Sequence, residues 1–201
     1  MRKQHFQIIE LRDIASSNDL SQQYIDGIAE CVGSAFGGGI SPEDALSHMQ
    51  GDQLLIGLDS DNNVAGFSAL AVETADNKGI EHTSLVYPCA YFAAAAIAKA
   101  YQGLGLYSSL NDRRLAFTEK SGLLNIYTRT QNPKVERGIT SALERMQEQN
   151  RIRKFTLGRY VVRAVYDGML TDERPQTKTI SYDNLDYDRG DANIVSWQMI
   201  K

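Results

Sequence analysis

The stretch of sequence that decides the fold runs from Ile97 to Tyr107 and reads Ile-Ala-Lys-Ala-Tyr-Gln-Gly-Leu-Gly-Leu-Tyr. It places the end of an apolar run before a glycine-containing turn and the start of an amphipathic segment. Glycines let a backbone turn tightly and approach a ligand, and the N–H groups in a helix's first turn point outward at the positive end of the helix dipole. A pyrophosphate fits such a cradle without a lysine. We therefore expect a strand, an anion-binding turn and a helix here.

Two nucleotide-binding sequence patterns also place a glycine-rich turn before the N-terminus of a helix, and this sequence matches both of them poorly. The dinucleotide pattern G-x-G-x-x-G fails at its last position, because the segment that begins at Gly103 has Ser108 there. That pattern also requires an acidic residue after the next strand, which here ends in Thr130, Gln131 and Asn132. The P-loop pattern fails because no Gly-Lys-Ser/Thr closes the turn. NAD binding therefore stays the weaker alternative.

The segment Gln102-Gly103-Leu104-Gly105-Leu106-Tyr107 resembles motif A of the GNAT N-acetyltransferases, Q/R-x-x-G-x-G/A. The resemblance implies an α+β, three-layer αβα fold in which helices flank a mixed, mostly antiparallel and splayed β-sheet. It also implies acetyl-CoA as the co-substrate. The residues that it places at the cofactor are Ile97, Ala98, Gln102, Gly103, Leu104, Gly105, Leu106, Tyr107 and Asn132.

Two positions depart from the family pattern. Tyr107 stands where the family usually has Gly or Ala, so its ring would crowd the phosphate loop or contact the ligand. Ile139 stands seven residues after Asn132, where many members have a tyrosine proposed as general acid. The catalytic assignment is weakened by these departures, whereas the cofactor assignment depends on the glycine turn and the order of elements.

The other elements follow from apolar periodicity and turn residues. Asn132 and Pro133 read as an N-cap and a proline at the first helical position, followed by an apolar stripe up to Met146. The alanine-rich run from Tyr91 to Ile97 suits a helix by propensity, but we expect a strand because the motif follows it. The expected strands are 7–11, 53–58, 64–74, the later part of 81–97, 123–130, 155–165 and 194–200. The expected helices are 20–36, 42–50, 105–121 and 133–149.

Length and composition indicate one compact domain over residues 1–201, because 42% hydrophobic residues suffice for a real core. The stretch 171–191 is polar and turn-rich, which predicts a long solvated loop. A net charge of -4 gives no electrostatic footprint for nucleic acid. No run of about 18 apolar residues appears, so no membrane span is expected and the cytoplasm is the expected compartment.

The cysteines and histidines point to no metal site. Cys31 and Cys89 are far apart and show no CxxC spacing, so we expect two reduced, buried thiols. His5, His48 and His82 are scattered without carboxylate or cysteine spacing.

The resemblance implies direct transfer of the acetyl group to a primary amine of a small molecule, peptide or protein, with backbone N–H groups near Ile97 and Ala98 stabilising the oxyanion. Tyr91 and Glu73 are the candidate catalytic residues, and Glu81 and His82 are rivals. Tyr91 has an ordinary pKa of about 10, so it would position a water rather than act as a base. A weaker hypothesis is that four C-terminal tyrosines line an acceptor pocket: Tyr160, Tyr166, Tyr182 and Tyr187.

Three questions stay open from the sequence. A non-catalytic CoA-binding sensor or scaffold would have the same fold, and Ile139 favours it slightly. A toxin-type acetyltransferase acting on aminoacyl-tRNA would also have this fold, but the negative net charge speaks against a polyanionic substrate. A homodimer through C-terminal edge strands is possible.

Overall fold

The computed structural model describes residues 9–14, 17–37, 49, 51–78, 85–166, 168–170 and 180–201. The strands are β1 (Glu10–Ile14), β2 (Gln53–Leu58), β3 (Val64–Glu73), β4 (Cys89–Ile97), β5 (Asn125–Thr130), β6 (Lys154–Val162) and β7 (Ala192–Ile200). The helices are α1 (Gln22–Phe36), α3 (Leu106–Lys120), α4 (Pro133–Glu148) and α5 (Ile180–Asp183), with short 3-10 helices η1 (Ser17–Asp19) and η2 (Lys99–Tyr101).

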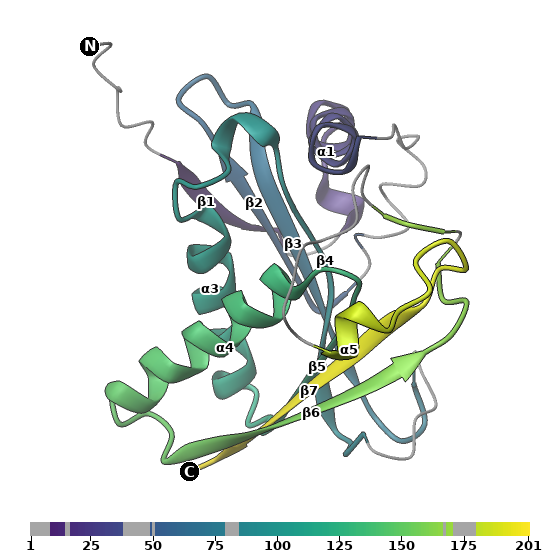
Figure 1. The fold of residues 1–201 in the computed structure, drawn as a ribbon. Helices are drawn as coiled ribbons and strands as arrows, with labels where there is room; N and C mark the ends of the chain where they lie inside the picture. The colour runs from purple at the N-terminus through teal and green to yellow at the C-terminus, as the bar shows by residue number, and fades with distance from the viewer. Residues whose placement is uncertain are drawn as a thin grey trace, which may run out of the picture.

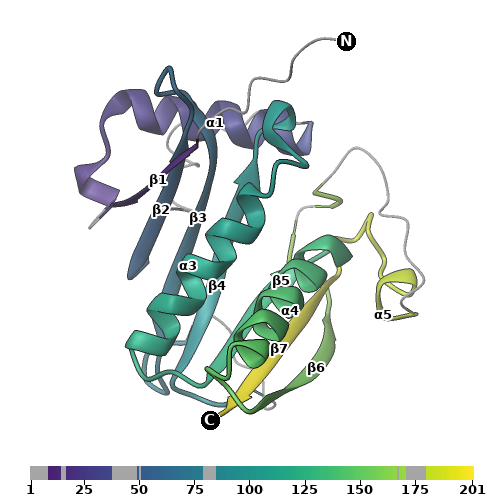
Figure 2. The ribbon, with the colours of Figure 1, turned by 90° about the vertical axis from the view of Figure 1, so that its left-hand side faces the viewer.

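The strands form one sheet in the order β1-β2-β3-β4-β5-β7-β6, in which only β4 and β5 run parallel (Figure 1). Helix α1 covers one face, where Ile28 and Cys31 pack on apolar side chains of β2, β3 and β4. Helices α3 and α4 lie side by side on the other face (Figure 2), where Leu115 and Leu143 pack on Trp197 and its neighbours. The expected α+β architecture with a mixed, mostly antiparallel sheet between helices is confirmed.

Strands β4 and β5 separate after a short paired stretch. Their parallel register holds for three pairs, which begin at Cys89 with Asn125 and end at Tyr91 with Tyr127. Both strands continue beyond the last pair, to Ile97 and Thr130. At the same level the β3–β4 register shifts, because three steps along β4 oppose two along β3. This bulge and the divergence of β5 produce the expected splay, which opens toward the start of α3.

The first strand lies three residues later than the sequence indicates. The prediction was 7–11, whereas β1 spans Glu10–Ile14 and pairs Glu10 with Leu58 and Ile14 with Leu54. It is an edge strand with no fully buried residue, so the charged Arg12 and Asp13 are accommodated on its two faces in exposed or partly exposed positions. Apolar content is a poor guide to such an edge, and the pairing with β2 sets the boundaries instead.

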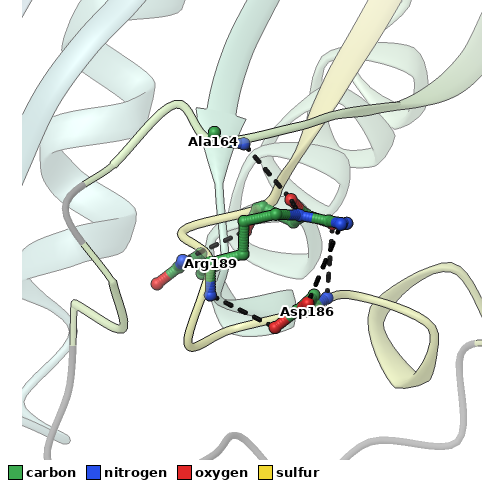
Figure 3. Close-up of polar contacts among 5 residues, drawn as sticks. Ala164, Asp186 and Arg189 are labelled. Atoms are coloured by element: carbon green, nitrogen blue, oxygen red, sulfur yellow. Dashed lines mark hydrogen bonds and ion pairs between the residues drawn. The ribbon is translucent and has the colours of Figure 1, made fainter.

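The C-terminal part of the predicted solvated loop is packed rather than solvated. Tyr182, Leu185 and Tyr187 are buried and form a small apolar cluster. Arg189 pairs with Asp191 at 2.5 Å, and Asp191 accepts a hydrogen bond from the Ala164 N–H at 3.2 Å (Figure 3). The polar composition of this stretch hides these contacts, because the charged groups satisfy one another next to the end of β6.

Three expectations fall wholly or largely outside the described residues. They are the helix at 42–50, of which only Met49 is described, the residues Glu81 and His82, and the first part of the loop at 171–191. Within the described ranges, no helix combines the length and apolar character needed to cross a membrane.

Candidate functional site

The glycine turn has the backbone geometry that its sequence requires. Gly103 and Gly105 have φ values of 81° and 83°, in the left-handed region that side chains disfavour. A Cβ built on either glycine would have no atom within 4 Å, so the space in front of the turn is open. Gly105 is the N-cap of α3, and the first intrahelical bond runs from the Ser109 N–H to its carbonyl. The preceding N–H groups of α3 therefore point out of the helix toward this open space.

Two side-chain bonds hold the turn in place. Gln102 Nε2 donates to the Ile97 carbonyl at 3.1 Å, which links the end of β4 to the start of the turn. The Tyr101 hydroxyl donates to Asp59 Oδ2 at 2.5 Å, and Asp59 Oδ1 also accepts the Asn63 N–H in the β2–β3 turn. The bond from Tyr101 was not foreseen, because nothing local relates it to a turn 42 residues earlier.

Tyr107 turns away from the glycine turn. A Cβ on Gly138 of α4 would lie 2.4 Å from Tyr107 Cε1, so the ring packs directly against that glycine. The crowding of the phosphate loop expected from Tyr107 therefore does not occur. Of the neighbouring leucines, Leu106 is buried against Leu55 and Leu110, whereas Leu104 is 54% exposed.

Only one of the two backbone groups proposed for the oxyanion faces the splay. The Ala98 N–H donates to the Ala65 carbonyl of β3 at 3.0 Å, so it is not free to bind a ligand, and that part of the expectation is wrong. Because backbone groups alternate between the two edges of an antiparallel strand, the N–H groups of Ile97 and Ala95 point toward β5. At this level β4 and β5 no longer pair, so both groups face the opening.

The two candidate catalytic residues lie in one cluster on the α1 side of the sheet, which we call the tyrosine cluster: Glu73, Tyr91, Tyr127, Arg129 and Tyr166. The rings of Tyr91 and Tyr127 stack with centroids 4.6 Å apart. The Tyr127 hydroxyl donates to Glu73 Oε2 at 2.6 Å. Arg129 Nε donates to the Tyr91 hydroxyl at 2.8 Å, and the Tyr166 hydroxyl donates to the Arg129 carbonyl at 3.3 Å.

Burial decides the protonation of these tyrosines. It raises the pKa of Tyr91 by more than the neighbouring Arg129 lowers it. Burial and the hydrogen bond to Glu73 also raise the pKa of Tyr127. Both phenols therefore stay protonated near neutral pH and can donate hydrogen bonds but cannot act as bases. Glu73 is 5% exposed and is the carboxylate of the cluster.

A cavity of about 200 Å³ lies next to this cluster, over β5, β6 and β7. Its lining includes Cys89, Tyr127, Tyr160 and Ser196, together with Leu85, and contains no charged side chain among the described residues. Of the four tyrosines expected at an acceptor pocket, Tyr160 lines this cavity and Tyr166 reaches the cluster. The other two lie elsewhere, because Tyr182 donates to Glu136 and Tyr187 to the Gln131 carbonyl.

Asn132 is the N-cap of α4. Its Oδ1 accepts the Lys134 N–H at 2.9 Å, as the sequence indicates for an asparagine before Pro133. Ile139 is fully buried in the core, and its aliphatic side chain has no polar group that could act as an acid. Among the described residues, no group of three or more His, Cys, Asp or Glu side chains could hold a metal ion.

Tyr127 and Arg129 were not predicted from the sequence as residues of the site. Both lie on β5, where Tyr127 pairs with Tyr91 in the parallel register and Arg129 donates to the Tyr91 hydroxyl from beyond the last pair. Strand alternation was the available signal, since Tyr127 and Arg129 are two residues apart and therefore share a face with each other.

No family model matches the sequence, and neither does any curated protein. Solved structures do match it over nearly their whole length. The ribosomal-protein-S18-alanine N-acetyltransferase of Escherichia coli has 15% identity and a TM-score of 0.54, with 96% of this chain and 95% of that chain covered. Ard1 from Thermoplasma volcanium has 12% identity and a TM-score of 0.55, with 96% and 98% covered.

A third structure, from Desulfovibrio desulfuricans and described as belonging to the GNAT acetyltransferase family, has 16% identity, a TM-score of 0.52 and coverage of 96% and 100%. At these identities the likeness concerns the arrangement of the elements. The mixed, mostly antiparallel sheet between helices and the separation of β4 from β5 are the features that the resemblance to the GNAT family implies. The chain therefore has the fold of the GNAT N-acetyltransferases.

Proposed function

We propose that this protein is an acetyltransferase that uses acetyl-CoA to acetylate a primary amine of a small molecule, peptide or protein. The observation that carries the proposal is the open glycine turn at the mouth of a splayed sheet. The buried carboxylate of Glu73 lies at the other end of β4, level with Cys89, where β4 and β5 are still paired. The structure of NatC, similar to this chain with a TM-score of 0.55 and 12% identity, is a complex with Gag peptide and CoA. That structure supports CoA as the ligand to test.

The residues at the turn fit a pyrophosphate. The left-handed glycines leave room for a close approach, and the outward N–H groups at the start of α3 supply donors at the positive end of the helix dipole. The edge of β4 beyond Tyr91 offers the N–H groups of Ala95 and Ile97, which suit the amide groups of an extended pantetheine arm. Thioester chemistry is what acetyl-CoA supplies when it is bound.

Glu73 is the proposed base. The amine nitrogen forms the new C–N bond, the C–S bond breaks with its electron pair on sulfur, and the amine proton passes to Glu73 directly or through a water. Tyr127 holds the carboxylate of Glu73 by its 2.6 Å bond. Tyr91, whose oxygen accepts from Arg129, has its own proton left to position the amine or the water.

The uncharged cavity beside the cluster favours an acceptor with a neutral body. Aromatic and aliphatic groups from Tyr160, Tyr127 and Leu85 would contact that body. Hydroxyl and amide groups in the lining, from Ser196 and Gln198 among others, would orient it. A non-catalytic CoA sensor remains the second candidate, and the buried Ile139 is the observation that favours it.

Replacing Glu73 separates these candidates. We expect Glu73→Gln to lower the rate of thiol release from acetyl-CoA by roughly 10²- to 10⁴-fold with an accepted amine, while acetyl-CoA binding stays unchanged. Glu119→Gln is the matched control, because Glu119 pairs with Arg151 in the last turn of α3. Free-thiol detection over a panel of amines is the assay. A wild-type protein that binds CoA but releases no thiol would establish the sensor, and an unchanged rate in Glu73→Gln would exclude Glu73 as the base.

A further inference from the structure

A buried arginine on the inner face of α3 has no charged partner. Arg114 is 2% exposed, and its guanidinium donates to Asn111 Oδ1 within the same helix. No carboxylate pairs with it in the part of the chain that the structure describes. A guanidinium stays protonated in proteins, so a full positive charge lies between α3, α4 and the sheet.

Two polar atoms around this charge, Asn111 Nδ2 and Arg114 Nε, are buried and make no hydrogen bond among the described residues. The Tyr107 hydroxyl is buried as well and interacts with the Arg114 guanidinium. Tyr107 and Arg114 face each other, since the guanidinium carbon lies 5.8 Å from the centre of the Tyr107 ring. Buried polar groups are nearly always hydrogen-bonded in native proteins, so these atoms are available to a ligand or to a water molecule.

The charge lies at the narrow end of the splay. The guanidinium carbon of Arg114 is 4.3 Å from the centre of the Phe92 ring. Phe92 directly follows Tyr91, the last residue of β4 that pairs with β5, and its carbonyl accepts the Thr128 hydroxyl at 2.9 Å. Arg114 lies on the face of the sheet that α3 and α4 cover, whereas the tyrosine cluster lies on the opposite face, which α1 covers.

A buried arginine without a charged partner is a poor source of core stability. Removing a charge from water costs free energy that a neutral Asn111 and an aromatic face offset only in part. An apolar side chain of similar volume is often as stable at such a position, or more stable. What Arg114 adds is a positive potential in a region of low dielectric, which stabilises negative charge that forms nearby.

We propose that Arg114 stabilises the thiolate that leaves when the acetyl group is transferred, with Tyr107 and Asn111 completing its surroundings. This inference rests on the proposed function. Arg114 keeps all its protons while the C–S bond breaks and the electron pair moves to sulfur. Ile139, at the position where many GNAT members have a tyrosine proposed as general acid, is apolar and supplies no group for the departing thiolate.

The test is a pH titration of the thiol of bound CoA, followed by the ultraviolet absorbance of the thiolate. A unit charge within about 10 Å, at an effective dielectric constant of about 20, shifts such a pKa by about one pH unit. We therefore expect the thiol of CoA bound to the wild-type protein to titrate about one pH unit or more below free CoA. Arg114→Met should return it to the free value, and Arg114→Lys should retain most of the shift.

Arg151→Met is the control, because it removes a positive charge that Glu119 neutralises at the far end of α3. It should leave the thiol pKa unchanged. A thiol that titrates in the wild-type protein as it does in free CoA overturns the inference, even if the Met variant fails to fold. An unchanged pKa in a folded Arg114→Met overturns it as well. If the wild-type protein binds no CoA, the proposed function and the inference both fail. If it binds CoA but the thiol pKa is not shifted, only the inference fails, so the two failures are distinguishable.

Discussion

Two glycines carry the proposed phosphate site, and they do so through backbone conformation rather than side chains. Gly103 and Gly105 both have positive φ values and open space where a Cβ would stand. Any other residue would meet backbone strain there, of roughly 1–2 kcal/mol. Its side chain would also point into the space that a pyrophosphate needs. The first effect lowers stability and the second lowers affinity, so a suitable control can separate them.

Gly122 provides that control, because it follows α3 with a φ of 70° and has equally open surroundings. We expect Gly105→Ala and Gly122→Ala to destabilise the protein by a similar amount, roughly 1 kcal/mol each. Only Gly105→Ala should weaken acetyl-CoA binding, by about tenfold or more, because its Cβ displaces the ligand. Urea unfolding and calorimetric titration measure the two quantities. Equal binding by both variants would remove the phosphate site from this turn.

At the scale of elements, the start of α4 combines a structural and a proposed functional role in one residue. Asn132 Oδ1 caps the helix through the Lys134 N–H. The resemblance to the GNAT family also places Asn132 at the pantetheine arm, which requires its amide as well. Aspartate caps a helix as well as asparagine does but has no amide N–H groups, so the two roles can be tested separately.

We expect Asn132→Asp to keep the stability of the wild-type protein while acetyl-CoA binds several-fold more weakly. Asn132→Ala should lose both, with about 1 kcal/mol of stability lost through the missing cap. Thermal unfolding and calorimetry on the same samples check this. If Asn132→Asp binds acetyl-CoA as tightly as the wild type, Asn132 is a helix cap and nothing more.

The elements also show how far sequence reasoning reaches. Helix α4 is predicted within one residue, because Asn132 and Pro133 mark its start locally and the stripe up to Met146 marks its buried face. The strand character of Tyr91–Ile97 was predicted only with the help of the motif. The edge strand β1 was misplaced, and the packing of Tyr182 was missed, because pairing and burial there depend on distant residues. The same holds for the candidate site. Gly103 and Gly105 could be predicted from the local sequence, whereas the place of Arg129 in the tyrosine cluster depends on strand pairing and could not.

At the scale of the whole molecule, two buried thiols couple folding to alkaline pH. Cys31 lies on α1 and Cys89 on β4, and both are almost fully buried. Burial raises the pKa of each thiol to about 12, from an unfolded value of about 8.5. A raised pKa means that the folded state holds the proton more tightly. The contribution of the two protonated thiols to the free energy of unfolding is fully present below about pH 8.5 and is lost as the pH rises toward about 12.

The free energy of unfolding should therefore fall as the pH rises from about 9 to about 11. Cys31→Ala should lower stability at neutral pH through the lost side chain but flatten this fall, because one of the two thiols no longer titrates. Urea unfolding at a series of pH values measures both effects. A variant with the same pH dependence as the wild type would show that Cys31 is not a source of the coupling.

The central claim, that the turn before α3 binds the pyrophosphate of acetyl-CoA, is tested most directly by calorimetric titration of the protein with acetyl-CoA, with NAD as a competing control. Both ligands carry a pyrophosphate, so selectivity is informative. The account predicts one acetyl-CoA bound per chain and no displacement by NAD. An absence of acetyl-CoA binding would contradict it, since the enzyme and the sensor both require this ligand, and preferential binding of NAD would assign the turn to a dinucleotide.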